Sequence, residues 1–130
     1  LLSAEEQERL GIRAFDVVAV TDTLAADHPE LVTGFLEVTD RAVAYLADNA
    51  EAAQPVIAEA AGLELKESNI VLSLFDFYRR DAQLTERWLD GGVQAFVEEV
   101  AVFFVEQGVL DQALDDYDRF VDKSFYRDAG

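Results

Sequence analysis

The run "FDVVAV" at residues 15–20 constrains the fold of this chain more than any other feature. Its short length and β-branched residues predict a strand buried on both faces, as in a parallel or mixed sheet. A strand leaves its backbone donors and acceptors unpaired unless another strand lies beside it, and the rest of the sequence shows mainly helical patterns. We therefore expect the partner strands in residues missing from this chain or in a second copy of it.

The composition is that of a globular domain with an acidic surface. The chain has 130 residues, of which 51% are hydrophobic, so it can bury a core and is not a disordered acidic tail. Acidic residues outnumber basic ones 27 to 10, and the net charge of −17 is spread along the chain. Such a surface repels phosphate backbones and anionic lipids, which disfavours roles at nucleic acid or at a membrane surface. The general interpretation of the charge is solubility or a salt-adapted host.

Several classes of site and segment are excluded or disfavoured. The chain has no cysteine, which excludes disulfides, thiolate metal sites and cysteine nucleophiles. No apolar run approaches the ~18 residues of a membrane-spanning helix. The opening residues "LLSAEEQERLG" lack the pattern of a secretion signal and an initiator methionine, so we expect a mature or trimmed product.

Two helices with apolar stripes are predicted to face the core. The first begins at Pro29, which suits the opening turn of a helix, and runs to about Asp48. The second lies in "VQAFVEEVAVFFVEQG" and ends at Gly108. The stripe of the first comprises Leu31, Val32, Phe35, Leu36, Ala42, Val43 and Leu46, and that of the second Val93, Phe96, Val97, Val100 and Phe104.

Shorter helices fill the remaining segments, which makes the predicted fold mainly α, with about six to seven helices and one or two strands. The first has a Ser3/Glu6 capping box and Gly11 as terminator, and the second has caps at residues 21–23 and ends near His28. A third covers residues 51–61, with Gln54 and Pro55 in its opening turn and Gly62 at its end, and a fourth covers residues 66–78. A helix after Asp81 is closed by Gly91 and Gly92, and a last helix lies around Phe120, Val121 and Phe125.

The order of these segments resembles a known family. "FDVVAV", "AADHPELVTGFLEVTDRAVAYLADN", "RWLDGG" and "FFVEQGVLDQALDDYDRFVD" follow one another as in the C-terminal part of solute-binding proteins of taurine, alkanesulfonate and nitrate-type ABC transporters. The likeness is greatest to the taurine-type branch and spans nearly all of the chain. The most specific elements are the Phe-Asp start of the strand, the His-Pro-Glu-Leu-Val helix opening and the Glu-Gln-Gly turn.

The resemblance implies a two-lobed α/β molecule of the periplasmic-binding-protein type II fold, closing on a solute at its hinge. Residues 1–130 would be its C-terminal portion, with residues 15–20 as the strand returning to the first lobe and the later helices packed on that lobe. The N-terminal remainder, and with it most of the pocket, would be absent. The implied function is the substrate-binding component of an importer for a small sulfonate such as taurine, with an ABC permease as partner. Its location would be periplasmic or extracellular, with a lipoprotein anchor at the missing N-terminus as one arrangement.

Two residues of the run are candidate ligand contacts. In the taurine-like branch, an acid at the Phe-Asp position would face the cleft and pair with the ligand's ammonium group, which the resemblance carries to Asp16, with Phe15 as a pocket wall. A charge within an apolar strand is costly to bury unless it is paired, so this position is of independent interest. The alternative is that Asp16 marks a strand end, with its carboxylate solvated or capping a helix.

Other polar residues give weaker signals, and no pattern predicts an enzyme, a metal or a cofactor. His28, the only histidine, precedes a proline at a helix start, which favours a surface or capping role. Trp88 is predicted to lie in the core. An acidic cluster lacks the loop spacing of a calcium site and is predicted to be a solvated turn. The cluster comprises Asp111, Asp115, Asp116 and Asp118.

A second hypothesis stays open beside the transport one: an acidic helical interaction domain with no small-molecule role, whose strand mediates self-association. In either case, we expect the isolated chain to cover its apolar strand with a second copy.

Overall fold

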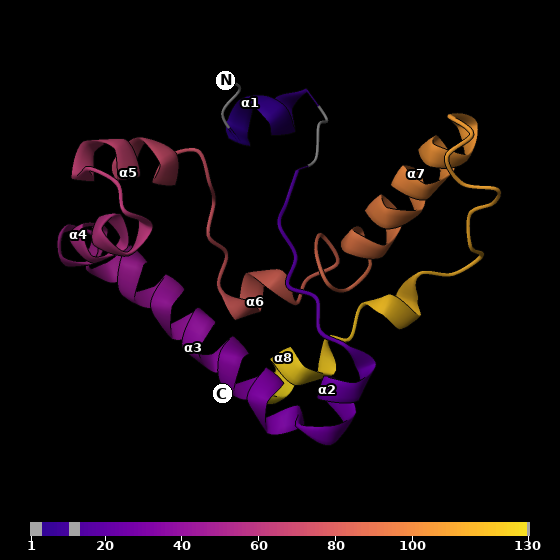
Figure 1. The fold of residues 1–130 in the computed structure, drawn as a ribbon, viewed down its shortest axis with the longest axis horizontal. Coiled ribbons are helices and arrows are strands. Elements are labelled where there is room, and N and C mark those ends of the chain that lie inside the picture. Colours follow the sequence, from indigo (N-terminus) through magenta and orange to yellow (C-terminus); the bar gives the residue numbers. More distant parts are fainter. Residues whose placement is uncertain (1–3, 11–13, 130) are drawn as a thin grey trace. The chain divides into compact units, whose positions relative to one another are not determined.

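The computed structural model describes residues 4–10 and 14–129 (Figure 1). These residues are mainly helical, as predicted. None of the described helices is both long and apolar enough to cross a membrane. The elements are α1 (Ala4–Arg9), α2 (Asp22–Asp27), α3 (Pro29–Asp48), α4 (Ala50–Ala61), α5 (Leu65–Leu72), α6 (Arg80–Gln83), α7 (Gly92–Glu106), the 3₁₀ helix η1 (Asp118–Phe120) and α8 (Ser124–Asp128).

The first three helices lie where the sequence places them. α3 begins at Pro29 and ends at Asp48, which confirms both predicted ends. α1 and α2 are also confirmed, but the proposed signals Ser3 and Gly11 lie outside the described residues. The α3 stripe is only partly covered: Val32, Leu36, Val43 and Leu46 are half-buried, whereas Leu31, Phe35 and Ala42 are exposed.

The predicted strand at residues 15–20 is wrong. No strand occurs in the described residues, and Figure 1 shows this run as an extended, non-helical segment between α1 and α2. Val17 is 69% exposed and Val18 is 74% exposed. The physical reason is the one that made the run unusual: a strand is defined by its backbone pairing, and the described chain supplies no second strand.

α3, α4 and α5 are joined by two tight connections. Asn49 ends α3 by donating its backbone N–H and its side-chain Nδ2 to the Tyr45 carbonyl, at 2.8 Å and 3.3 Å, and its own carbonyl accepts the first hydrogen bonds of α4. Gly62 ends α4 with a φ of 66°, a left-handed conformation that glycine adopts without steric cost, as predicted. Pro55 lies inside α4 and not in its opening turn, because the helix already begins at Ala50.

α5 is shorter than the predicted helix over residues 66–78. Ser73 Oγ donates to the Ile70 carbonyl at 2.7 Å, and the N–H groups of Leu74 and Phe75 bond three residues back, to Val71 and Leu72. These tighter bonds replace the helical pattern, so the helix ends at Leu72.

The segment before α7 is a compact turn and not a continuous helix. α6 covers only Arg80–Gln83, and the following residues bond locally, with Thr85 Oγ1 donating to the Ala82 carbonyl at 2.7 Å. A Cβ added to Gly92 would collide with the backbone carbonyl of Arg87, so this turn requires glycine there. Trp88 is half-buried beside it, which is less burial than the predicted core position implies.

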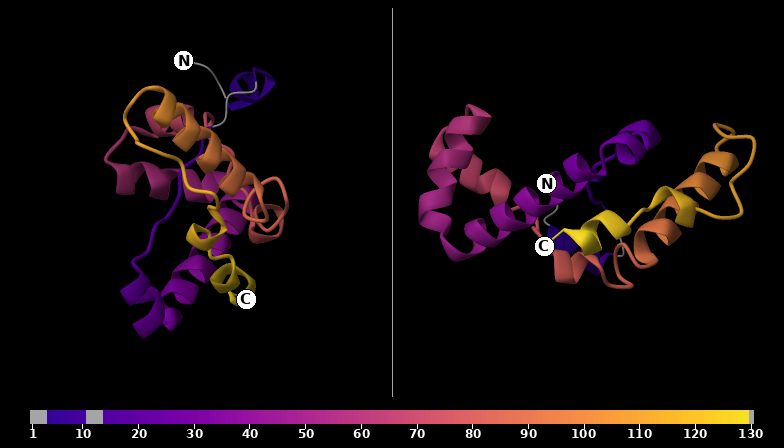
Figure 2. Two further views of the ribbon diagram at one scale, coloured as in Figure 1. Left: turned by 90° about the vertical axis from the view of Figure 1, so that its right-hand side faces the viewer. Right: turned by 90° about the horizontal axis from the view of Figure 1, so that it is seen from below.

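α7 ends as predicted, at a glycine. Gly108 has a φ of 70°, and the Val109 N–H donates to the Phe104 carbonyl at 2.9 Å. Figure 2 shows the chain then continuing without regular structure before η1 and α8, which replace the single predicted last helix. Within the α7 stripe, Val93 is buried, Phe96 and Val100 are half-buried, and Val97 and Phe104 are exposed.

The chain divides into two units. Among the described residues, one unit comprises residues 4–10, 14–21 and 38–79, and the other residues 22–37 and 80–129, so α3 contributes to both. Within the first unit, α4 and α5 pack side by side (Figure 1), and the buried residues Ala53, Ala58 and Ser68 lie on these helices. In the second unit, the buried apolar residues are Val93, Ala101, Tyr126 and Ala129. Most of the buried residues in the two units are small, namely alanine and serine.

Candidate functional site

The two predicted ligand contacts lie in the extended run before α2. Asp16 is exposed and Phe15 is half-buried. α2 begins at Asp22, six positions after Asp16, so Asp16 is not at the position of a cap for that helix. The structure therefore places the Asp16 carboxylate in solvent, on a segment whose neighbouring valines are also exposed.

His28 lies at the junction of α2 and α3, as its position before Pro29 indicates. Its Nδ1 lies 3.4 Å from Glu30 Oε1, and both side chains are more than half exposed. The backbone N–H of His28 donates to the Leu24 carbonyl at 2.9 Å, and the His28 carbonyl accepts from Leu31 at 3.0 Å. His28 thus joins two helices through its backbone, with an exposed imidazole and one neighbouring carboxylate.

The acidic cluster after α7 forms turns. Asp116 Oδ1 accepts from the Asp118 N–H at 2.8 Å, a side-chain to backbone bond typical of an Asx turn. In the part of the chain that the structure describes, no three acidic or histidine side chains converge as a metal site would require. This geometry is that of the solvated turn predicted from the sequence.

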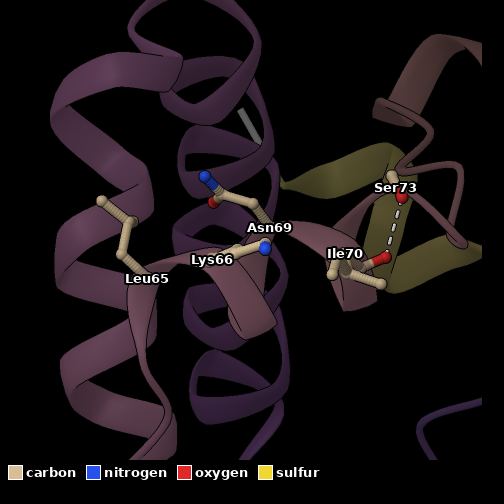
Figure 3. A pocket seen from close by; sticks show the side chains of 5 residues that line it. All are labelled: Leu65, Lys66, Asn69, Ile70 and Ser73. Atoms are coloured by element: carbon tan, nitrogen blue, oxygen red, sulfur yellow. Dashed lines mark hydrogen bonds between the residues drawn. The ribbon is translucent and has the colours of Figure 1, made fainter.

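One depression lies on the surface of α5, and the sequence did not indicate it. It is shallow and open, and Figure 3 shows its lining side chains, which come from α5 and the residue after it: Leu65, Lys66, Asn69, Ile70 and Ser73. Asn69 Oδ1 is buried and accepts no hydrogen bond within the described residues. The depression offers one ammonium group, one amide, one hydroxyl and two apolar side chains, without the enclosure that a small-molecule site needs.

A polar clasp holds the C-terminal segment to the turn before α7. Lys123 Nζ donates to Asp90 Oδ1, and Gln83 Nε2 donates to the Tyr126 hydroxyl at 3.1 Å. The hydrogen bond from Lys123, and then its positive charge, lower the pKa of Asp90 below its usual value, with a smaller contribution from Arg127. The Asp90–Lys123 pair is partly exposed, so it orients the chain end more than it stabilises the fold.

Sequence reasoning missed this clasp because its partners lie 33 and 43 residues apart. Contacts of that separation leave no local pattern. The only local signal was the Asp122–Ser124 start of α8, where Asp122 Oδ1 accepts from the Ser124 N–H at 2.9 Å.

Comparison with known proteins identifies no relative: no family model matches the chain, and neither a curated protein nor a solved structure matches it.

Proposed function

We propose that the chain is the C-terminal part of the substrate-binding component of an ABC importer for a small sulfonate such as taurine. The proposal rests on the order of the segments from "FDVVAV" to "RFVD", which resembles that of the taurine-type solute-binding proteins. In such a protein the helices after residue 20 belong to the first lobe, and the permease and the solute are the partners. The protein would act in the periplasm or outside the cell.

The composition of residues 15–20 supports the proposal, although the run forms no strand within the described residues. Val17 and Val18 are the two most exposed large apolar residues of the described chain. A β-branched run of this kind gains little from exposure to water, but it suits a central strand of a parallel sheet, buried on both faces. A larger protein with a sheet in its first lobe would supply the missing strands.

In this proposal, Asp16 supplies the charge that recognises the solute. A carboxylate at the start of a returning strand faces the cleft between the lobes, where it pairs with the ammonium group of taurine, and Phe15 forms part of the wall. Pairing in a closed, water-poor cleft is stronger than at an open surface. The residues that bind the sulfonate would lie outside this chain.

The test is a thermal-shift measurement on the protein expressed from its whole gene. Taurine should raise the melting temperature, because a ligand at about 100 times its Kd stabilises the folded state by about 2.7 kcal/mol. Ethanesulfonate, which lacks the ammonium group, should give little or no shift. Asp16→Asn should remove the taurine response, whereas Asp27→Asn, at an exposed carboxylate on α2, should retain it. The absence of a shift with every sulfonate would contradict the proposal.

A second candidate, an acidic helical interaction domain, is favoured by the apolar side chains that α7 exposes, among them Val102 and Phe103. It predicts an open reading frame that begins close to Leu1, whereas the first proposal predicts a gene with a long upstream region. The intact mass of the natural product, compared with the length of its gene, separates the two.

A further inference from the structure

The outward side of α7 carries apolar and acidic residues on one surface. Helical spacing places Val102 and Phe103 one turn after Glu98 and Glu99, and Glu106 lies one turn further on. We call these five residues the α7 outer face. All five are exposed, Val102 by 44% and Phe103 by 53%. The buried residues of the same helix, Val93 and Ala101, lie on its opposite side.

The charged residues of α7 and of the segment after it have a single sign. Every charged residue between Arg87 and Arg119 is acidic, so α7 and the segment that follows it carry no positive charge of their own. Within the described residues, the side-chain carboxylates of Glu98, Glu99 and Glu106 are in no ion pair or hydrogen bond. The three carboxylates are therefore available to a partner. The side chains of Val102 and Phe103, which lie between them, are exposed.

We propose that the α7 outer face binds a basic amphipathic helix of a partner protein. An amphipathic helix contacts a surface through apolar residues at i, i+3, i+4 and i+7, which span about two helical turns. The α7 outer face has a similar length, about 12 Å along two turns. Lysine or arginine residues beside those anchors would reach the three carboxylates with their charged ends while their stems cover apolar surface.

Charge decides against the other occupants. Nucleic acid and anionic membranes carry the same sign as this face and are repelled. A second copy bringing the same face would set carboxylates against carboxylates in a symmetric contact, which is also repulsive. The inference does not depend on solute binding, because the face lies on α7 and involves neither Phe15 nor Asp16.

The experiment measures fluorescence anisotropy of a labelled peptide with leucine and lysine at helical spacing, titrated with the intact chain. The peptide should bind, and binding should weaken as salt screens the charges. A peptide with glutamate in place of lysine should bind at least ~10-fold more weakly, because its charges oppose those of the face. Failure of the basic peptide to bind, or equal binding of both peptides, would overturn the inference.

Variants locate the binding surface. Phe103→Ser should weaken binding about 10-fold as an anchor loss, and the double change Glu98→Lys with Glu99→Lys should do so at least as strongly. Matched controls should bind like the unchanged chain: Phe35→Ser on α3, with a similar exposure of 51%, and Glu51→Lys with Glu59→Lys on α4.

Two further readouts make each outcome decisive. Circular dichroism should show that all variants keep their helices, since the substituted residues are exposed. Equal loss in the controls would overturn the inference, because binding would then follow net charge or general hydrophobicity. A concentration-dependent mass that disappears only in Phe103→Ser would assign the face to a second copy and would also overturn it.

Discussion

The pair α4–α5 and the run at residues 15–20 are both rich in apolar residues, yet only the first buries part of them within the chain. Ala53 and Ala58 are 5% and 4% exposed, because α5 follows α4 directly and packs against it. Val17 and Val18 are mostly exposed, because an extended run needs a strand beside it. A helix satisfies its backbone within itself, whereas a strand depends on residues elsewhere, and the described residues supply no second strand.

The largest effect should come from placing the same charge in each region. Ala58→Asp buries a carboxylate among apolar groups and should destabilise the chain by about 3 kcal/mol or more. Val18→Asp, at a site exposed in the single chain, should change the free energy of unfolding by less than about 0.5 kcal/mol when it is measured below the concentration at which two chains pair. Urea denaturation followed by circular dichroism measures both. Similar losses would mean that the run at residues 15–20 is packed, and the comparison would fail.

A second contrast tests whether the turn before α7 is tightly packed, by comparing a glycine in that turn with a glycine on α3. Gly92→Ala places a Cβ against the Arg87 carbonyl and should cost about 1–3 kcal/mol, as overpacking does. Gly34→Ala on α3 meets nothing within 4 Å and should stabilise by roughly 0.5–1 kcal/mol, because alanine favours a helix interior. Melting temperatures of the two variants should move in opposite directions; a neutral Gly92→Ala would show that the turn is not closed.

The third test concerns the end of α4. Gly62→Ala should cost about 1 kcal/mol, because alanine resists a φ of 66° although no atom lies near the added Cβ. Replacement by asparagine, which tolerates this conformation better, should cost less. Thermal unfolding of both variants checks the order, and equal costs would argue that lost space, not backbone conformation, is responsible.

The smallest effect is expected at the clasp and depends on pH. The pKa of Asp90 is lowered in the folded chain, so its pairing with Lys123 stabilises the fold above the usual aspartate range near about 4 and is lost as pH falls through the lowered value. Asp90→Asn should therefore be less stable than the unchanged chain at pH 7, and the difference should vanish in strong acid. Lys123→Gln should show the same profile, and a difference independent of pH would contradict the role of the pair.

Local signals predicted the long helices α3, α4 and α7 well, but they predicted the bounds of α5, α6 and the C-terminal helices and the long-range contacts poorly. Pro29, Gly62 and Gly108 each act on their own turn of helix, and the structure confirms the ends they mark. The end of α5 was not predicted, because it depends on a hydrogen bond from the Ser73 hydroxyl to a backbone carbonyl. The spacing of apolar residues gives no sign of such a bond.

The candidate sites show the same division. The prediction for Asp16 and Phe15 comes from a resemblance, and the prediction of a solvated turn around Asp116 comes from the lack of calcium-loop spacing. Both predictions depend on residues that are neighbours in sequence. The clasp between Asp90 and Lys123 depends on the fold bringing distant residues together. The strand was predicted wrongly for a related reason: β-branched composition reports what a segment suits, but pairing decides whether a strand exists.

Light scattering of the isolated protein at micromolar concentration most directly tests the central claim, that residues 15–20 pair with a second copy when the chain is isolated. We expect a mass of at least two chains. The mass should return to that of one chain in Val18→Pro, which lacks a backbone N–H to pair and leaves the helices intact. A monodisperse single-chain mass for the unchanged protein across that concentration range would contradict it.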